Sequence, residues 1–397
     1  MARLTMTDAG RIYLDHNAGA PLRPRVAGLV GDLMTRVGNP SSVHGEGRAA
    51  RALVEAARAQ VAGLCGVPAP HVVFTSGATE ANVTALSPLW KAGRGERQFT
   101  RVLIGGTEHP SVTAGGRFPE SQREILPVDS DGVVDVAALA ARVHALSVAG
   151  ALPLVAIQAA NSETGVLQPL AEIARVLDGT SAILHVDAVQ AAGRIAIDMA
   201  GWGAHSLALS AHKIGGPQGV GALVLRDAGL RPAPLLTGGG QENWNRAGTE
   251  NVVAIAGFGL AAELAAAETS GWDEIAAFRD GLERALCHIW SDTVVFGTGV
   301  PRLANTSCFA VPGVSAETAL IALDLAGIAV SSGSACSSGK VGVSPVLTAM
   351  GVSADLARGA IRVSLGRDNG EAEIERFLAA WRQISGRIRQ AGAGRAA

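Results

Sequence analysis

The chain has 397 residues, which is long enough for two hydrophobic cores, and its formal net charge at pH 7 is −2. So small a charge argues against binding to nucleic acid or to an anionic membrane surface. No apolar run reaches the roughly 18 residues of a membrane-spanning helix, and residues 1–10 lack the apolar core of a signal peptide. We therefore expect a cytoplasmic protein whose four cysteines remain reduced.

Short apolar runs alternate with helical patterns in the first part of the chain. A strand is predicted at 11–14 and a helix over 47–64, and further strands are predicted at 72–74, 101–104, 152–157 and 182–186. Strands separated by helical stretches predict βαβ units and a mainly parallel sheet. The apolar runs at 206–210 and 219–225, joined by a Gly/Pro turn, predict a hairpin added to that sheet.

The pattern changes after a long Ala-rich helix predicted over 251–269, a kind of helix that often bridges two domains. Beyond it we expect a helix near 273–290, a strand near 303–311, a helix near 315–326, a loop, helices to the end and a frayed tail over 391–397. The sequence thus predicts an α/β fold. A large domain would span 15–262, and a smaller α+β domain would combine 1–14 with 263–397.

The four cysteines differ in their neighbours. Cys65, Cys287 and Cys308 lie among apolar residues and are predicted to be buried packing residues. Cys336 lies in a polar segment rich in glycine and serine that begins at Ser331. Such a loop could carry a thiolate to a substrate, whereas a cysteine fixed in a core could not.

Two strand ends carry residues suited to a phosphate-bearing cofactor. The turn after strand 72–74 begins a helix at Ala78 and Thr79, where free backbone N–H groups and hydroxyls could bind phosphate. Asp187 ends another apolar strand, and a carboxylate there could hold a protonated pyridine nitrogen. Each feature alone has an ordinary alternative, a plain helix cap or a turn cap.

Two further strand ends carry groups for covalent and proton-transfer chemistry. Lys213 follows the apolar strand 206–210 in a Gly-rich turn, a setting that is unusual for a solvated surface charge. A lysine that binds a cofactor covalently needs a desolvated setting to be a free amine, and Ser210 and His212 beside it could reach the phosphate. His109 follows strand 101–104, where an imidazole could stack on a ring and transfer protons. Taken singly, an exposed hairpin lysine and a structural histidine remain the alternatives.

In chain order these motifs resemble the class V aminotransferase family, and within it the cysteine desulfurases related to NifS and IscS. The resemblance extends from about residue 11 to 390. It includes further motifs at 13–18, 38–44, 161–165, 246–249 and 331–336.

The resemblance implies a fold type I large domain that binds pyridoxal 5′-phosphate, plus the smaller α+β domain, with no metal ion. Lys213 would bind the cofactor covalently and His109 would stack on it and transfer protons. The other implied cofactor contacts are Asp187 at the pyridine nitrogen, Gln190 and Ser162 near the ring oxygen, Ala78, Thr79, Ser210 and His212 at the phosphate, and Thr249 at the phosphate of the neighbouring subunit in a homodimer. Arg362 and Asn39 would hold the substrate carboxylate.

The implied reaction removes sulfur from L-cysteine, which gives L-alanine and a persulfide on Cys336. The persulfide sulfur would pass to an acceptor protein in iron–sulfur cluster assembly or in thiolation of a cofactor or tRNA, and the sequence does not name that acceptor. The alternatives are an ordinary class V aminotransferase, selenocysteine lyase activity and a non-catalytic scaffold for sulfur-transfer partners. An aminotransferase would need no mobile cysteine, which is why we favour the desulfurase.

The sequence departs from the family pattern at three places. Ser162 stands where the family usually has a second asparagine, and its side chain is shorter than the asparagine expected near the cofactor ring. Asn243 and Trp244 replace the usual basic residue after Gln241-Glu242, and Gly19-Ala20 replaces a threonine pair.

Overall fold

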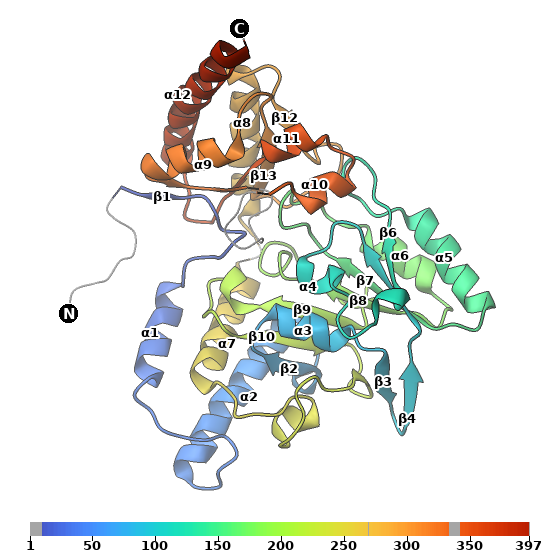
Figure 1. The fold of residues 1–397 in the computed structure, drawn as a ribbon. Coiled ribbons are helices and arrows are strands. Elements are labelled where there is room, and N and C mark those ends of the chain that lie inside the picture. Colours follow the sequence, from blue (N-terminus) through green and yellow to red (C-terminus); the bar gives the residue numbers. More distant parts are fainter. Residues whose placement is uncertain (1–9, 269, 333–341, 397) are drawn as a thin grey trace.

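The computed structural model describes residues 10–268, 270–332 and 342–396, with side chains described to residue 390. A large domain around a wide sheet and a smaller domain above it are visible in Figure 1. Residues 12–13 near the N-terminus and the helices at the C-terminal end both belong to the upper part of the molecule. The predicted α/β fold with a second, smaller domain is confirmed.

In the described part of the chain, the large domain is built on a seven-stranded sheet. In spatial order its strands are β2 (Val72–Thr75), β10 (Gly221–Leu225), β9 (Ser206–Ser210), β8 (Ile183–Asp187), β7 (Pro153–Gln158), β5 (Arg101–Gly105) and β6 (Arg123–Leu126). From β9 to β6 neighbouring strands are parallel, while β10 is antiparallel to both β9 and β2. Both the mainly parallel sheet and the added hairpin are therefore as predicted.

Helices cover both faces of this sheet, which explains why its strands are apolar without alternation. The bounds of the large-domain helices are α1 (Pro24–Leu33), α2 (Gly45–Cys65), α3 (Ala78–Ala85), α4 (Pro110–Thr113), α5 (Val136–Val148), α6 (Leu170–Leu177) and α7 (Val252–Ala267). Residues of α2, α5, α6 and α7 share one hydrophobic cluster with the sheet, and residues of α3 and α4 share another. The α3 cluster also contains Trp90 and Phe99, at the small sheet of β11 (Leu230–Pro232), β3 (Leu89–Ala92) and β4 (Gly95–Gln98).

Local sequence explains where α2 begins and ends and how closely it packs. Nδ1 of His44 accepts a hydrogen bond from Gly47 N and caps the first turn, while Gly66 ends the helix in a left-handed conformation with φ of 66°. A Cβ on Gly259 of α7 would lie 2.5 Å from Cα of Ala57, so glycine permits the close contact between α2 and α7.

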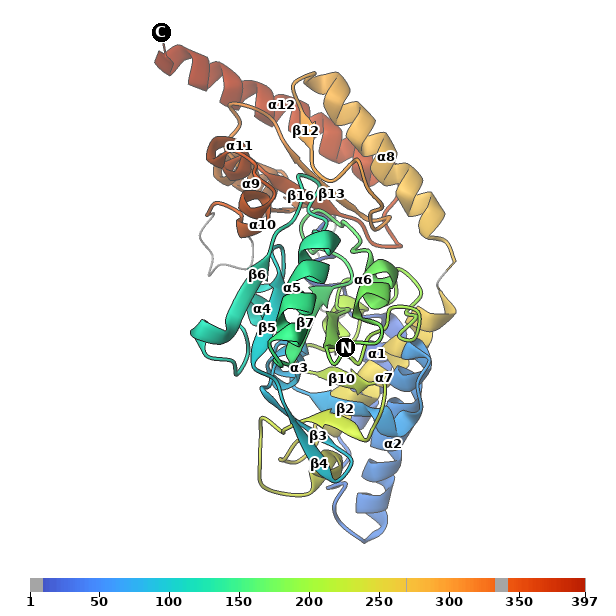
Figure 2. The ribbon, with the colours of Figure 1, turned by 90° about the vertical axis from the view of Figure 1, so that its right-hand side faces the viewer.

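The described residues of the small domain form a four-stranded antiparallel sheet with helices packed on it. Its strands are β12 (Val294–Val295), β13 (Thr306–Ala310), β16 (Ile361–Ser364) and β15 (Ser331–Ser332), and β1 (Ile12–Tyr13) pairs in parallel with β14 (Ile328–Ala329). Its helices are α8 (Trp272–Ile289), α9 (Ala316–Leu325), α10 (Pro345–Ala349), α11 (Ala354–Arg358) and α12 (Glu371–Ala396). In Figures 1 and 2 α8 and α12 lie side by side. Phe309 of β13 and Phe377 and Trp381 of α12 belong to one hydrophobic cluster of this domain.

Three expectations for the C-terminal part were wrong. Strand β16 lies where the sequence predicted only a loop and helices. The prediction failed because two residues of this strand, Arg362 and Ser364, are polar and yet buried. Helix α12 continues to Ala396, where a frayed tail was expected. Cys287 is exposed, because α8 buries Leu282 and Leu286 and the next residue is turned about 100° away from that face.

Among the helices that the structure describes, no single one is long and apolar enough to cross a membrane. The pair α7 and α8 passes that criterion only together, by length and composition, and is bent by 82°.

Candidate active site

A pocket of about 540 Å³ lies at the carboxyl ends of β7, β8 and β9, where Gln158, Asp187 and Ser210 end their strands. This is the edge at which parallel α/β sheets bind ligands. The structure brings most of the sequence-predicted residues together there. Those that line the pocket are Ala78, Thr79, His109, Ser162, Asp187, Gln190, Ser210, His212, Lys213 and Arg362.

One end of the pocket is suited to an anion. Helix α3 begins there after Gly77, which has no side-chain cap, so the first N–H groups of the helix border the pocket together with the Thr79 hydroxyl. Ser210 and His212 line the same pocket from the end of β9. Burial and the neighbouring Lys213 lower the pKa of His212 to about 4, so its imidazole is neutral at pH 7.

Asp187 is held by two hydrogen bonds. Its Oδ2 accepts from Nδ2 of Asn82 at 2.8 Å, and its Oδ1 accepts from the backbone N of Val189 at 3.0 Å. The side chain is buried. A fixed, buried carboxylate of this kind is suited to a cationic nitrogen on a ligand.

Asn82 connects Asp187 to a buried chain of hydrogen bonds. Its Oδ1 lies 2.8 Å from Nε2 of His185, whose Nδ1 lies 2.8 Å from Oγ of Ser206. Burial lowers the pKa of His185 to about 3, so this ring is neutral. Since an amide oxygen accepts, Nε2 of His185 carries the hydrogen, and Nδ1 accepts from the Ser206 hydroxyl.

His109 is joined to the same chain through Ser111. Nδ1 of His109 accepts from the backbone N of Ser111 at 3.1 Å and lies 2.8 Å from Oγ of Ser111, which accepts from Asn82 at 2.9 Å. Burial lowers the pKa of His109, and this effect exceeds the opposite one of Asp187. Neither Asn82 nor Ser111 was predicted from the sequence as a site residue. The available signal was a polar residue three positions after Thr79 on a helix, and a serine two positions after His109.

Lys213 lies in a 3-10 turn, Ala211–Lys213, directly after β9. Its ammonium donates to the carbonyl oxygens of Asn17 and, at 3.0 Å, Ala18. Gln190 donates to the same Asn17 oxygen at 3.1 Å and accepts from Nη1 of Arg194 at 2.7 Å. The N-terminal segment therefore borders the lysine, which the sequence patterns did not reveal.

Arg362 reaches the pocket from β16 of the small domain. One of its terminal nitrogens pairs with Oδ1 of Asp15 at 2.7 Å and the other donates to the carbonyl oxygen of Ser162 at 3.0 Å. Its Nε is buried without a hydrogen-bond partner among the described groups. A buried guanidinium with an unused donor is suited to a carboxylate ligand.

Three predicted site residues are not among those that line the pocket. Asn39 lies exposed on the loop between α1 and α2, at the bottom of Figure 1, and its side chain caps Ser41 N at 2.9 Å. Thr249 lines a neighbouring pocket that shares Ser76 and Gly219 with this one. Cys336 lies outside the described residues.

The departures from the family pattern have distinct structural settings. Glu242, Asn243 and Trp244 have φ of 47°, 53° and 66°, a left-handed turn that is unusual for residues other than glycine. The buried Glu242 accepts two hydrogen bonds from Arg58, at 2.7 and 2.8 Å, which stabilises the turn. Trp244 is 70% exposed. At Gly19, a Cβ would lie 3.4 Å from Nδ1 of His212.

The fold and the pocket together define an α/β protein with a candidate ligand site at the carboxyl edge of a parallel sheet. The family described as Aminotransferase class-V matches residues 12–377, and the chain belongs to this family.

Its relatives and structural neighbours agree with this. A protein named cysteine desulfurase from Cereibacter sphaeroides is 40% identical over 374 residues, which is 93% of this chain and 94% of the relative. The solved NifS-like protein from Rickettsia africae ESF-5 has 35% identity and a TM-score of 0.84, over 95% of this chain and 99% of that one. SspA, solved in complex with cysteine, has 25% identity and a TM-score of 0.74, over 89% and 98%. The predicted family and fold type are confirmed.

Proposed function

We propose that the chain is a pyridoxal-phosphate-dependent cysteine desulfurase, a sulfurtransferase that converts L-cysteine to L-alanine and carries the sulfur on Cys336. The observation that carries this proposal is the convergence of Lys213, Asp187, His109 and Arg362 on one pocket. The names of the relatives, cysteine desulfurase and NifS-like protein, support the same reaction.

The residues of the pocket fit pyridoxal 5′-phosphate. Asp187 is a fixed acceptor for a protonated pyridine nitrogen, and Lys213 supplies the amine for covalent attachment. The start of α3 with Thr79, Ser210 and His212 supplies donors for a phosphate. Gln190 retains a second amide hydrogen, which with Ser162 would serve the ring oxygen.

In the proposed reaction each of four residues of the chain has a separate role. When bound, the cofactor supplies an electron sink for charge that develops at the substrate α-carbon. Arg362 would hold the substrate carboxylate, Lys213 would take the α-proton and His109 would assist proton transfer. The Cys336 thiolate would then form an S–S bond with the substrate sulfur. The electrons of the broken C–S bond would stay with the substrate carbon, which takes up a proton to become alanine.

The proposal extends to the assembly. We place the cofactor domain at 15–262 and the small domain, with the Cys336 segment, at 1–14 and 263–397, which is supported by the pairing of β1 with β14. Thr249 and Asn39 lie outside the pocket of their own chain, so in the proposed homodimer they would serve the pocket of the other subunit. The persulfide sulfur would pass to an acceptor protein.

The experiment is borohydride reduction of the yellow protein, followed by peptide mapping and by an assay with L-cysteine and a thiol reductant. We expect the reduced cofactor on Lys213, and sulfide and alanine in equal amounts. Cofactor on another lysine would overturn the assignment of Lys213. Efficient transfer of amino groups to 2-oxo acids, without sulfide, would indicate an aminotransferase instead.

A further inference from the structure

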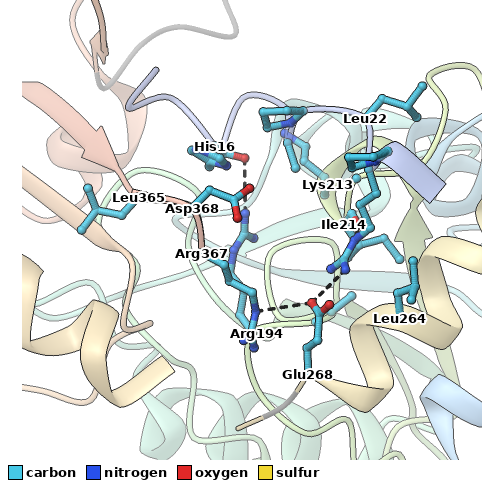
Figure 3. Close-up of a pocket in the computed structure, with 18 of the residues that line it drawn as sticks. His16, Leu22, Arg194, Lys213, Ile214, Leu264, Glu268, Leu365, Arg367 and Asp368 are labelled. Atoms are coloured by element: carbon cyan, nitrogen blue, oxygen red, sulfur yellow. Dashed lines mark hydrogen bonds and ion pairs between the residues drawn. The ribbon is translucent and has the colours of Figure 1, made fainter. Parts of the chain in front are cut away.

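A second pocket, of about 600 Å³, lies where the two domains meet (Figure 3). The large domain contributes the segment 20–25, the turn around Arg194 and the end of α7. The small domain contributes Trp272 and residues 365–368. Lys213 lines both this pocket and the candidate active site, so the two lie on either side of one lysine.

Among the described residues that line this second pocket, basic side chains outnumber acidic ones. The basic residues are Arg23, Arg25, Arg194 and Arg367, against the acids Glu268 and Asp368. Lys213 also borders the pocket, but it is not counted because the proposed function assigns its amine to the cofactor. His16 adds no charge near neutral pH, because burial and the adjacent Arg194 lower its pKa to about 4. The excess of positive charge in a concave site favours an anionic ligand.

The carboxylate of Glu268 does not provide hydrogen-bond acceptors for all the donors of Arg23 and Arg367. Oε2 of Glu268 is shared, lying 2.8 Å from Nη1 of Arg23 and 3.7 Å from Nε of Arg367. Nη1 of Arg367 donates to the carbonyl oxygen of Ser270 at 3.0 Å, while Nη2 is buried without a hydrogen-bond partner among the described groups. The Arg367 guanidinium also stacks on the Trp272 ring at 4.5 Å, which fixes its plane. A guanidinium whose plane is fixed by stacking, and which shares its carboxylate with a second arginine, is preorganised for an oxoanion.

Arg194 adds a buried cation with a connection to the active site. It is buried, donates to Oε1 and O of Gln190 and lies 3.3 Å from the carbonyl oxygen of His16. Figure 3 shows Arg194, Arg367, Glu268 and Asp368 gathered in one part of the pocket, while Leu264 and Ile214 lie on another side. The site therefore combines charged groups with apolar walls.

We propose that this second pocket binds a small organic anion that carries carboxylate or phosphate groups. Arg23 and Arg367 hold its oxygens from the two domains, and the apolar walls cover its hydrocarbon part. Because the ligand contacts both domains, it binds the folded arrangement and not the unfolded chain, and so it raises the thermal stability of the protein. The proposal rests on the residues of this pocket, and its test uses the proposed function only to keep the candidate active site filled with cofactor.

The experiment measures binding of citrate and of inorganic phosphate to the cofactor-loaded protein by calorimetry and thermal unfolding. Ionic strength is held constant with chloride, and the loaded cofactor keeps its own phosphate site filled. We expect saturable binding of at least one anion and a rise in Tm. A tighter complex with citrate would identify a carboxylate ligand, and one with phosphate a phosphate ligand.

Matched variants separate this site from surface charge. Arg367→Gln and Arg23→Gln should each weaken binding about tenfold or more, the loss of a charge-assisted contact. Arg389→Gln is the control, because Arg389 likewise stacks on a tryptophan, Trp290 at 4.4 Å, and pairs with Asp292, but does not line the pocket. Absence of saturable binding, or equal weakening in Arg389→Gln and Arg367→Gln, would overturn the proposal, whatever the activity on cysteine.

Discussion

Nδ2 of Asn82 lies 2.8 Å from Oδ2 of Asp187, so a residue in the middle of α3 holds the carboxylate at the end of β8. The same amide group donates to Ser111 and accepts from His185. In the proposed enzyme this links the partner of the pyridine nitrogen to the turn that carries His109. Asn82 is therefore a positioning residue for the cofactor.

Asn82→Ala should weaken cofactor binding and slow turnover. It removes a buried hydrogen bond to Asp187 and leaves His185 without an acceptor, a loss of about 1–3 kcal/mol, or roughly 5- to 150-fold. The measurement is the cofactor dissociation constant by absorbance, with kcat. Thr84→Val is the control, because the Thr84 hydroxyl bonds only within α3, to the carbonyl oxygen of Glu80 at 2.7 Å. Equal losses in both variants would reduce Asn82 to a structural residue.

Arg362→Ala should raise KM for cysteine while the cofactor spectrum stays unchanged. Loss of a charge-assisted grip on the substrate carboxylate costs about 2–4 kcal/mol, or roughly 30- to 1,000-fold. The variant also breaks the ion pair with Asp15, so a stability control is needed. Arg302→Ala breaks a comparable pair, with Glu283 at 2.8 Å, outside the pocket. It should lower stability and leave KM alone. An unchanged KM in Arg362→Ala would place the carboxylate elsewhere.

Glu163 should make stability depend on pH. Burial raises the pKa of its carboxyl to about 7, although the Ser344 hydroxyl donates to it at 2.5 Å. Between the unfolded pKa of about 4.3 and the folded value, the native state holds a proton that the unfolded state lacks. The free energy of unfolding should therefore fall as pH rises through this window, by up to about 3 kcal/mol.

Urea unfolding at several pH values from about 5 to about 8 measures this slope. Glu163→Gln should flatten it, because the amide does not titrate, whereas the exposed acid variant Glu172→Gln should keep the wild-type slope. A slope unchanged by Glu163→Gln would show that other groups cause the pH dependence.

The sequence predicted site residues correctly where the local context of a residue indicates its role. Asp187 at a strand end and Lys213 in a Gly-rich turn were both assigned to the pocket, since parallel strands bring their carboxyl ends together. Contacts between distant segments were not predictable. The backbone carbonyl oxygens of Asn17 and Ala18 accept hydrogen bonds from Lys213 because the chain passes from the small domain back to the large one at this point.

Cys287 and β16 illustrate the same limit for burial. A cysteine between Leu286 and His288 looks buried in sequence, but helix geometry decides which neighbour faces the core. The polar residues Arg362 and Ser364 hid the strand β16 in the sequence. They can be buried in a strand because each has a polar partner across the domain junction, Asp15 for Arg362 and the backbone of Asn17 for Ser364. Such partners are supplied by the tertiary structure and leave no local pattern.

The most direct test of the central claim is turnover of L-cysteine by Cys336→Ala. This variant should keep its cofactor, because Lys213 and Asp187 are unchanged, but should form no persulfide and release almost no sulfide or alanine. Cys287→Ala is the matched control, since it removes an exposed cysteine on α8 away from the candidate active site, and should keep the wild-type rate. If Cys336→Ala released sulfide and alanine at the wild-type rate, the proposed desulfurase mechanism would be contradicted.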